Sequence, residues 1–78
     1  MNTKKVIVYS TPTCVYCKMA KEYFTANGFA YTEYNVAEND AKRDEMVTKS
    51  GQLGVPVIDI DGKIVVAFNK TEIVAALQ

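Results

Sequence analysis

The first apolar run of this chain lies close to its start. Residues 4–10 (KKVIVYS) are nearly continuously apolar and rich in β-branched side chains. Such a run is typical of a strand that is covered on both faces, so we expect it in the centre of a sheet. Pro12 then ends the strand, because a proline lacks the backbone N–H that a sheet ladder needs. Thr13 or Cys14 is expected to begin a helix there.

A helical spacing of apolar residues follows over residues 15–27. At about 100° per residue, the apolar side chains fall on one side of this helix and the lysines on the other. Gly28 suits a left-handed cap at its end. Residues 29–36 (FAYTEYNV) are aromatic and β-branched and predict a second strand. Strand, helix and strand in this order predict a right-handed parallel βαβ unit. The apolar side is expected to hold Tyr16, Met19, Ala20, Tyr23 and Phe24.

The second half of the chain predicts a helix, a hairpin and a last helix. Asn39 or Asp40 is expected to cap a weakly amphipathic helix that runs to about Ser50. Asp61-Gly62, between VIDI and KIVVAF, is typical of a two-residue hairpin turn. Residues 69–72 (NKTE) resemble a capping box with Asn69 as the cap, ahead of a helix over 73–77. The sequence thus predicts an α/β fold, βαβ then ββα, with a four-stranded mixed sheet and three helices.

Composition and charge narrow the function classes. The 78 residues are 49% hydrophobic, which suits a single globular domain over 1–78. Nine basic and nine acidic residues cancel, which argues against binding to nucleic acid or to a membrane surface. The apolar runs are too short to span a bilayer, and MNTKK leads into a strand rather than a signal peptide. We therefore expect a monomeric protein of the cytoplasm.

The two cysteines of the chain, Cys14 and Cys17, stand three positions apart at the predicted strand-to-helix junction. On a helix, this spacing puts the two Cβ atoms about 5–6 Å apart, close to disulfide geometry. A loop this short constrains the unfolded chain little, so a disulfide here would contribute little stability. In a reducing cytosol it would be transient, and therefore chemical in purpose.

The two sulfurs are expected to differ. Cys14 stands where the free N–H groups and the dipole of the helix converge, which stabilises a thiolate, and Lys18 adds a positive charge. Cys17 lies one turn further in, toward the sheet, and should be less accessible. This asymmetry predicts Cys14 as the attacking thiolate and Cys17 as the resolving thiol.

Other interpretations of the cysteine pair are weaker. A zinc site needs four ligands, but the chain offers two cysteines and no histidine, so no metal is expected in a single chain. A dimer that shares a metal or an iron–sulfur cluster could complete the ligand set. Two buried cysteines without any chemistry are the remaining alternative. Cysteine-hydrolase chemistry would need a histidine base, which the chain lacks.

Three segments resemble the glutaredoxins. YSTPTCVYCKMAKEYF is similar to their active-site segment, GVPVIDIDG to their loop and strand with a cis-proline, and AFNKTEI to their turn into the last helix. The segments follow the family order along almost the whole chain. The resemblance implies a thioredoxin fold and a thiol–disulfide oxidoreductase with glutathione as its reductant, in which Cys14 forms the mixed disulfide.

The resemblance also implies glutathione contacts. Tyr16 would flank the cysteine of glutathione, Val55 would pair with its backbone beside a cis Val55–Pro56 bond, and Gln52 would reach its glycyl carboxylate. Gln52 could equally be a plain loop residue, and Asn69 could equally be a simple cap or do both. The weaker alternative for Tyr16 is an ordinary aromatic at the helix rim, and the alternative for Pro56 is a trans-proline that starts a strand. The full set of implied contacts is Thr11, Tyr16, Gln52, Val55, Pro56, Phe68 and Asn69.

Several positions depart from the family pattern and weaken the case for tight glutathione binding. Val15 stands where proline is commonest, Thr11 where many members carry a lysine, Val66-Ala67 where they carry Gly-Gly, and Lys70 where they carry an acid. An alternative is therefore a redoxin reduced by thioredoxin reductase, for example one that serves ribonucleotide reductase. The cluster-carrying dimer is a third. Expected partners are glutathione, glutathionylated or disulfide-containing proteins, and thioredoxin reductase in the alternative.

Overall fold

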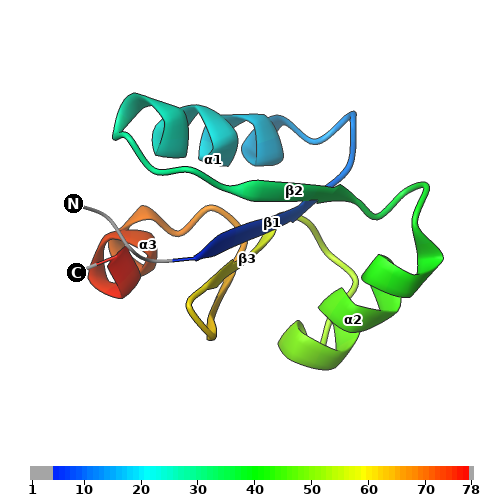
Figure 1. Ribbon diagram of the computed structural model, residues 1–78. Helices are drawn as coiled ribbons and strands as arrows, with labels where there is room; N and C mark the ends of the chain where they lie inside the picture. The colour runs from blue at the N-terminus through cyan, green and yellow to red at the C-terminus, as the bar shows by residue number, and fades with distance from the viewer. Residues whose placement is uncertain (1–4, 78) are drawn as a thin grey trace.

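The computed structural model describes residues 5–77, which form a four-stranded sheet with helices on both faces (Figure 1). The strands lie in the order β2-β1-β3-β4. The predicted α/β fold with a mixed sheet and three helices is confirmed. Its elements are β1 (Val6–Ser10), α1 (Val15–Ala26), β2 (Thr32–Asn35), α2 (Asp40–Ser50), β3 (Val57–Ile60), β4 (Lys63–Val66) and α3 (Lys70–Leu77).

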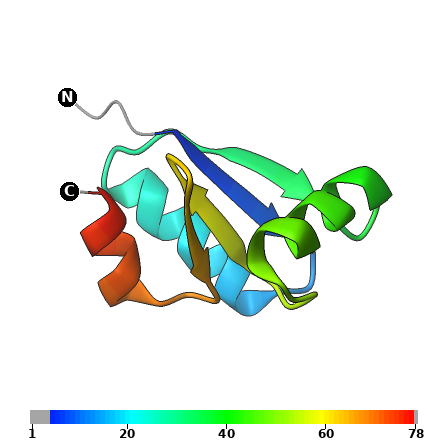
Figure 2. The ribbon, with the colours of Figure 1, turned by 90° about the horizontal axis from the view of Figure 1, so that it is seen from below.

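The strand pairing brings three chain segments to one edge of the sheet. β1 pairs parallel with β2 and antiparallel with β3, and Tyr9 lies opposite Val57. β3 pairs antiparallel with β4, and Val57 lies opposite Val66. The end of β1, the start of β3 and the end of β4 therefore meet. Figure 2 shows the entry to α1 and the loop after α2 at this same end of the sheet.

The sheet separates two apolar cores. α1 and α3 share one core, while α2 covers the other face, in front of β1 in Figure 2. β1 contributes Val6 and Val8 to the first core and Tyr9 to the second, so the prediction of a central strand covered on both faces is confirmed. The first core holds Val6, Val8, Ala20, Phe24, Ile58, Ile60, Val65, Ile73 and Ala76, and the second holds Tyr9, Val36, Met46 and Val57.

The prediction of the buried face of α1 is partly wrong. Cys17, Ala20 and Phe24 are buried, whereas the side chains of Tyr16 and Met19 are 61% and 41% exposed. Residues 17, 20 and 24 form an i, i+3, i+7 stripe. The buried stripe is therefore rotated relative to the predicted face, with the small side chains of Cys17 and Ala20 near the start of the helix and Phe24 near its end.

Some predicted boundaries are also wrong. β2 spans only Thr32–Asn35, because Phe29 and Tyr31 turn inward and pack against the first core instead of joining the ladder. α3 begins at Lys70 rather than at residue 73, and its first turn is polar because it faces solvent. The predicted cap is confirmed, since Asn69 Oδ1 accepts the N–H of Glu72 at 3.2 Å. Lys4 of the first predicted strand lies outside the described residues.

The β3–β4 turn confirms the predicted hairpin. Asp61 has φ 53° and Gly62 has φ 94°, the two positive φ values that a type I′ turn requires. A third positive φ, 60°, falls on Ala67 just after β4. Its N–H donates to the carbonyl of Pro56 at 2.8 Å, which ties the end of β4 to the start of β3. This left-handed conformation is costly for alanine and easy for glycine.

Ala67→Gly is therefore expected to raise the free energy of unfolding by about 0.5–1 kcal/mol, because glycine adopts the native φ without strain. Ala75 is a matched control, since it is exposed within α3. Ala75→Gly should lower stability by up to about 1 kcal/mol, because glycine is a poor helix former. Urea denaturation of both variants measures whether the free energy of unfolding rises in Ala67→Gly and falls in Ala75→Gly. Destabilisation by Ala67→Gly would contradict the prediction.

Candidate active site

Cys14 is the N-cap of α1, and its backbone is extended there, with φ −87° and ψ 113°. Its Sγ accepts a hydrogen bond from the N–H of Cys17 at 3.1 Å. The backbone holds this arrangement from both sides, because the Cys14 N–H donates to the Thr11 carbonyl and the Cys14 carbonyl accepts from Lys18. The first turn of α1 carries no acidic residue to oppose a thiolate. The sulfur thus occupies the position of a helix-capping anion.

Cys17 lies beneath Cys14 and is 0% exposed. Burial, followed by its hydrogen bond with Cys14, raises the pKa of the Cys17 thiol from its ordinary value to about 12. Cys17 is therefore a thiol near neutral pH. Both cysteines are free in the structure. The predicted difference in accessibility between the two sulfurs is confirmed, since Cys14 is partly exposed.

A cis peptide bond joins Val55 and Pro56, as the family resemblance implied. Pro56 is buried, and Val55 is partly exposed. Both precede Val57, which pairs with Tyr9, so they lie at the sheet edge where β1 leads into Thr11 and Cys14. The cysteine pair and the cis-proline segment therefore meet at one end of the sheet.

The third segment at this edge follows β4. Phe68 is partly buried, and its ring contacts Tyr23 of α1 edge-on at a centroid distance of 6.2 Å. Lys70 lies 5.5 Å above the same Tyr23 ring. Asn69 serves as the cap of α3, where its Oδ1 accepts the N–H of Glu72. A ligand role for Asn69 stays a prediction.

The other implied contacts are placed less tightly. Tyr16 extends from the first turn of α1 into solvent. Gln52 lies in the loop after α2, where its N–H donates to Ser50 Oγ at 3.3 Å. Thr11 is partly exposed and acts through its carbonyl, which accepts the Cys14 N–H. Their roles toward glutathione stay predictions.

Two lysines follow the cysteine pair on α1, and one of them is already paired. Lys21 on α1 forms an ion pair with Glu33 of β2 at 2.7 Å, and Ser10 Oγ donates to the same carboxylate. The hydrogen bond from Lys21 and then that from Ser10 hold the pKa of Glu33 below its ordinary value. Lys18, one residue after Cys17, is exposed. Lys18 is the lysine that the sequence predicted to add a positive charge beside the cysteine pair.

Sequence reasoning missed a polar cluster on the other face of the sheet. Lys49 of α2 reaches Asp59 of β3 at 2.7 Å and the Tyr9 hydroxyl at 2.9 Å. A signal was present, because a carboxylate within the apolar run VIDI must find a partner when it is buried.

Among residues 5–77, no group of three or more metal-ligating side chains is close enough to hold an ion. In that same range, no helix is long and apolar enough to cross a membrane.

Comparisons with known proteins agree with this geometry. The chain is 52% identical over 66 residues to a protein of Clostridium pasteurianum named "uncharacterized glutaredoxin-like 8.6 kDa protein in rubredoxin operon", which covers 85% of this chain and 88% of that one. It is 40% identical over 58 residues to glutaredoxin 3 of Escherichia coli K12, which covers 74% and 70% of the two chains.

The crystal structure of the thioredoxin-like protein BC3987 superposes on this fold with a TM-score of 0.86 at 29% identity, over 92% of this chain and 99% of that one. The sequence model of the Glutaredoxin family matches residues 6–65, from β1 through the cysteine pair and the cis-proline to β4. The chain therefore belongs to the glutaredoxin family of the thioredoxin superfamily, a family of thiol–disulfide oxidoreductases.

Proposed function

We propose that this protein is a glutathione-dependent thiol–disulfide oxidoreductase that reduces glutathionylated proteins and protein disulfides. One observation carries the proposal: Cys14 Sγ accepts the Cys17 N–H at the start of α1, while Cys17 is held beneath it as a buried thiol. The partly exposed sulfur of Cys14, stabilised by this hydrogen bond, attacks the substrate disulfide. Cys17, which keeps its proton, then resolves the mixed disulfide. The proposal includes a cytoplasmic location, where a reducing pool returns the pair to the dithiol.

The reaction is two successive exchanges. The Cys14 thiolate attacks the glutathione sulfur of a glutathionylated protein, a Cys14–glutathione disulfide forms, and the protein thiolate leaves and takes up a proton. A second glutathione thiolate then attacks the glutathione sulfur of that disulfide, which releases oxidised glutathione and restores the Cys14 thiolate. With a protein disulfide, the Cys14 thiolate first forms a mixed disulfide with one protein sulfur and releases the other as a thiolate. Cys17 then gives up its proton and attacks the Cys14 sulfur, so the bond between Cys14 and the protein breaks, the second protein thiolate leaves, and the Cys14–Cys17 disulfide closes. Two glutathione thiols then reduce this disulfide and leave as oxidised glutathione.

We propose that three segments recognise glutathione. The backbone of Val55, beside the cis-proline, would pair with the tripeptide, and Gln52 and Thr11 would face its carboxylates. The start of α3, where backbone N–H groups and the helix dipole point outward, would suit an anionic end of the ligand. Tyr16 and Phe68 would flank the bound tripeptide. The family resemblance supports each of these assignments. The position of Val55 at the end of the sheet, near Thr11, also supports the pairing of its backbone with the tripeptide.

A redoxin that takes electrons from thioredoxin reductase is the second candidate. The apolar side chains of Val15 and Leu53, on the two segments that flank the site, are 69% and 70% exposed. Exposed apolar groups of this kind suit a protein partner. In addition, Lys70 stands where members of the family carry an acid, a departure that weakens the case for tight glutathione binding.

A reductase pairing assay separates the two candidates. NADPH oxidation is followed with the protein and a disulfide substrate, in one arm with glutathione and glutathione reductase and in the other with thioredoxin reductase. The proposal expects consumption in the glutathione arm that exceeds the same arm without the protein by at least about tenfold. Consumption confined to the thioredoxin reductase arm would reject glutathione dependence in favour of the second candidate.

A further inference from the structure

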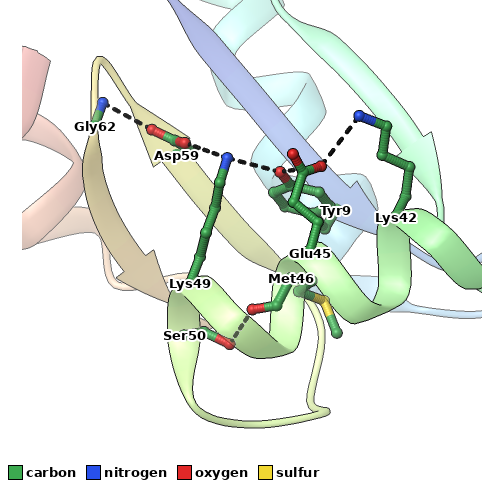
Figure 3. A network of polar contacts seen from close by, with 8 residues as sticks. All are labelled: Tyr9, Lys42, Glu45, Met46, Lys49, Ser50, Asp59 and Gly62. Atoms are coloured by element: carbon green, nitrogen blue, oxygen red, sulfur yellow. Dashed lines mark hydrogen bonds and ion pairs between the residues drawn. The ribbon is translucent and has the colours of Figure 1, made fainter.

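α2 is attached to the sheet in large part by polar contacts. Met46 is its one fully buried residue. Beside it, Lys49 donates to Asp59 and to Tyr9, and Glu45 accepts from Tyr9 at 3.0 Å and from Lys42 at 3.1 Å (Figure 3). An open, polar cavity of about 320 Å³ borders this network. The position of this helix therefore depends on hydrogen-bond geometry as well as on apolar packing.

Lys49 and Asp59 bracket the loop that carries the cis-proline. Lys49 stands in the last turn of α2, Asp59 stands in β3, and residues 51–56 lie between these two elements. The near side of the loop is fixed by Ser50, whose Oγ donates to the Met46 carbonyl at 2.7 Å and accepts the Gln52 N–H (Figure 3 shows the first contact). On its far side the loop enters β3 at Val57, which pairs with Tyr9, and the same strand carries Asp59.

Both carboxylate oxygens of Asp59 accept hydrogen bonds, which fix the position of this side chain. One carboxylate oxygen accepts from Lys49, and the other accepts the N–H of Gly62 in the hairpin turn at 2.8 Å. The two side chains of the ion pair are 28% and 11% exposed, so water screens the pair less than a surface pair. Although burial lowers it, the hydrogen bonds to Asp59 and Tyr9 raise the pKa of Lys49 above its ordinary value.

We propose that Lys49 and Asp59 are positioning residues, which hold loop 51–56 so that the Val55 backbone faces the Cys14 sulfur in the geometry that a disulfide substrate needs. This inference rests on the proposed function, because it assigns the loop to substrate recognition. Neither side chain touches the cysteines. Their effect is on the place and order of the loop, and hence on substrate binding more than on the chemistry of Cys14.

The test compares Lys49→Met with Lys42→Met in the reduction of a glutathionylated peptide. Lys42 is a matched control, because it stands on the same helix and pairs with Glu45 in the same network but does not reach Asp59. Lys49→Met should raise KM about fivefold or more with a smaller change in kcat, which corresponds to about 1 kcal/mol of lost binding. Lys42→Met should change KM by less than about twofold, and Lys49→Arg, which keeps the charge, should restore most of the loss.

Two further measurements make the result specific. Alkylation of Cys14 by iodoacetamide uses no substrate recognition, so its rate should be unchanged in Lys49→Met. The amides of residues 52–55 should exchange hydrogen faster in Lys49→Met than in Lys42→Met. Asp59→Asn keeps an oxygen for Gly62 and removes the charge, so it repeats the test if Lys49→Met does not fold.

The two proposals can fail separately. If the wild-type protein does not reduce the glutathionylated peptide, the proposed function fails, and the exchange rates alone decide whether the ion pair positions the loop. Equal exchange rates in Lys49→Met and Lys42→Met, or equal increases in KM, would overturn the inference.

Discussion

Cys14→Ser is expected to abolish the reduction of a glutathionylated protein, whereas Cys17→Ser is expected to retain it. The first change removes the sulfur that caps α1, and a serine hydroxyl is a far weaker nucleophile, so the rate should fall at least about a thousandfold. The second change leaves Cys14 in place, along with the Cys17 N–H that it accepts, because that donor belongs to the backbone. Deglutathionylation by Cys14 alone should therefore continue.

The same two variants behave differently on a protein disulfide. That reaction needs the second sulfur to release the mixed disulfide, so Cys17→Ser should lose it while keeping the first activity. Steady-state rates with a glutathionylated peptide and with insulin measure the two reactions side by side. Thr25→Ser, an exposed change on α1, serves as the control for the substitution itself. Equal loss of both reactions in both variants would argue against the route through Cys14 alone.

The parts of the site that the sequence predicted correctly depend on local signals. Cys14 and Cys17 lie in one helical turn, so the cap and the difference in burial follow from three residues of spacing. Asp61-Gly62 specifies its turn through the φ values that these residue types tolerate. Interactions confined to a few neighbouring residues are those that a sequence pattern can predict.

The remaining parts depend on contacts between residues that are distant in sequence, or on a conflict between the conformation that a residue prefers and the one that the fold requires. The Lys49–Asp59 pair joins a helix to a strand, and the Lys21–Glu33 pair joins a helix to a sheet edge, so neither follows from spacing along one element. Ala67 adopts a left-handed φ because its N–H must reach Pro56, against the preference of alanine itself. The family resemblance, rather than local propensity, predicted the cis Val55–Pro56 bond.

Cys17 should resist alkylation in the folded protein at pH values where Cys14 reacts. Burial, then the hydrogen bond with Cys14, raises the pKa of Cys17 from about 9 to about 12, so its thiolate fraction near neutral pH is lower than that of an ordinary thiol by about a thousandfold. Only the thiolate reacts. Mass spectrometry after a short pulse of iodoacetamide should find the label on Cys14, while the protein unfolded in urea should be labelled at both positions.

The pH dependence tests the cause of this protection. An ordinary thiol stops gaining reactivity above its pKa near 9, whereas the rate at Cys17 should keep rising toward pH 12. Between these values the unfolded chain has lost the Cys17 proton and the folded chain has kept it, so folding stability must fall as the pH rises. Cys17→Ala should reduce that fall. If Cys17 were alkylated at neutral pH as fast as Cys14, the two sulfurs would be equivalent, and the division between attacking and resolving thiols would lose its physical basis.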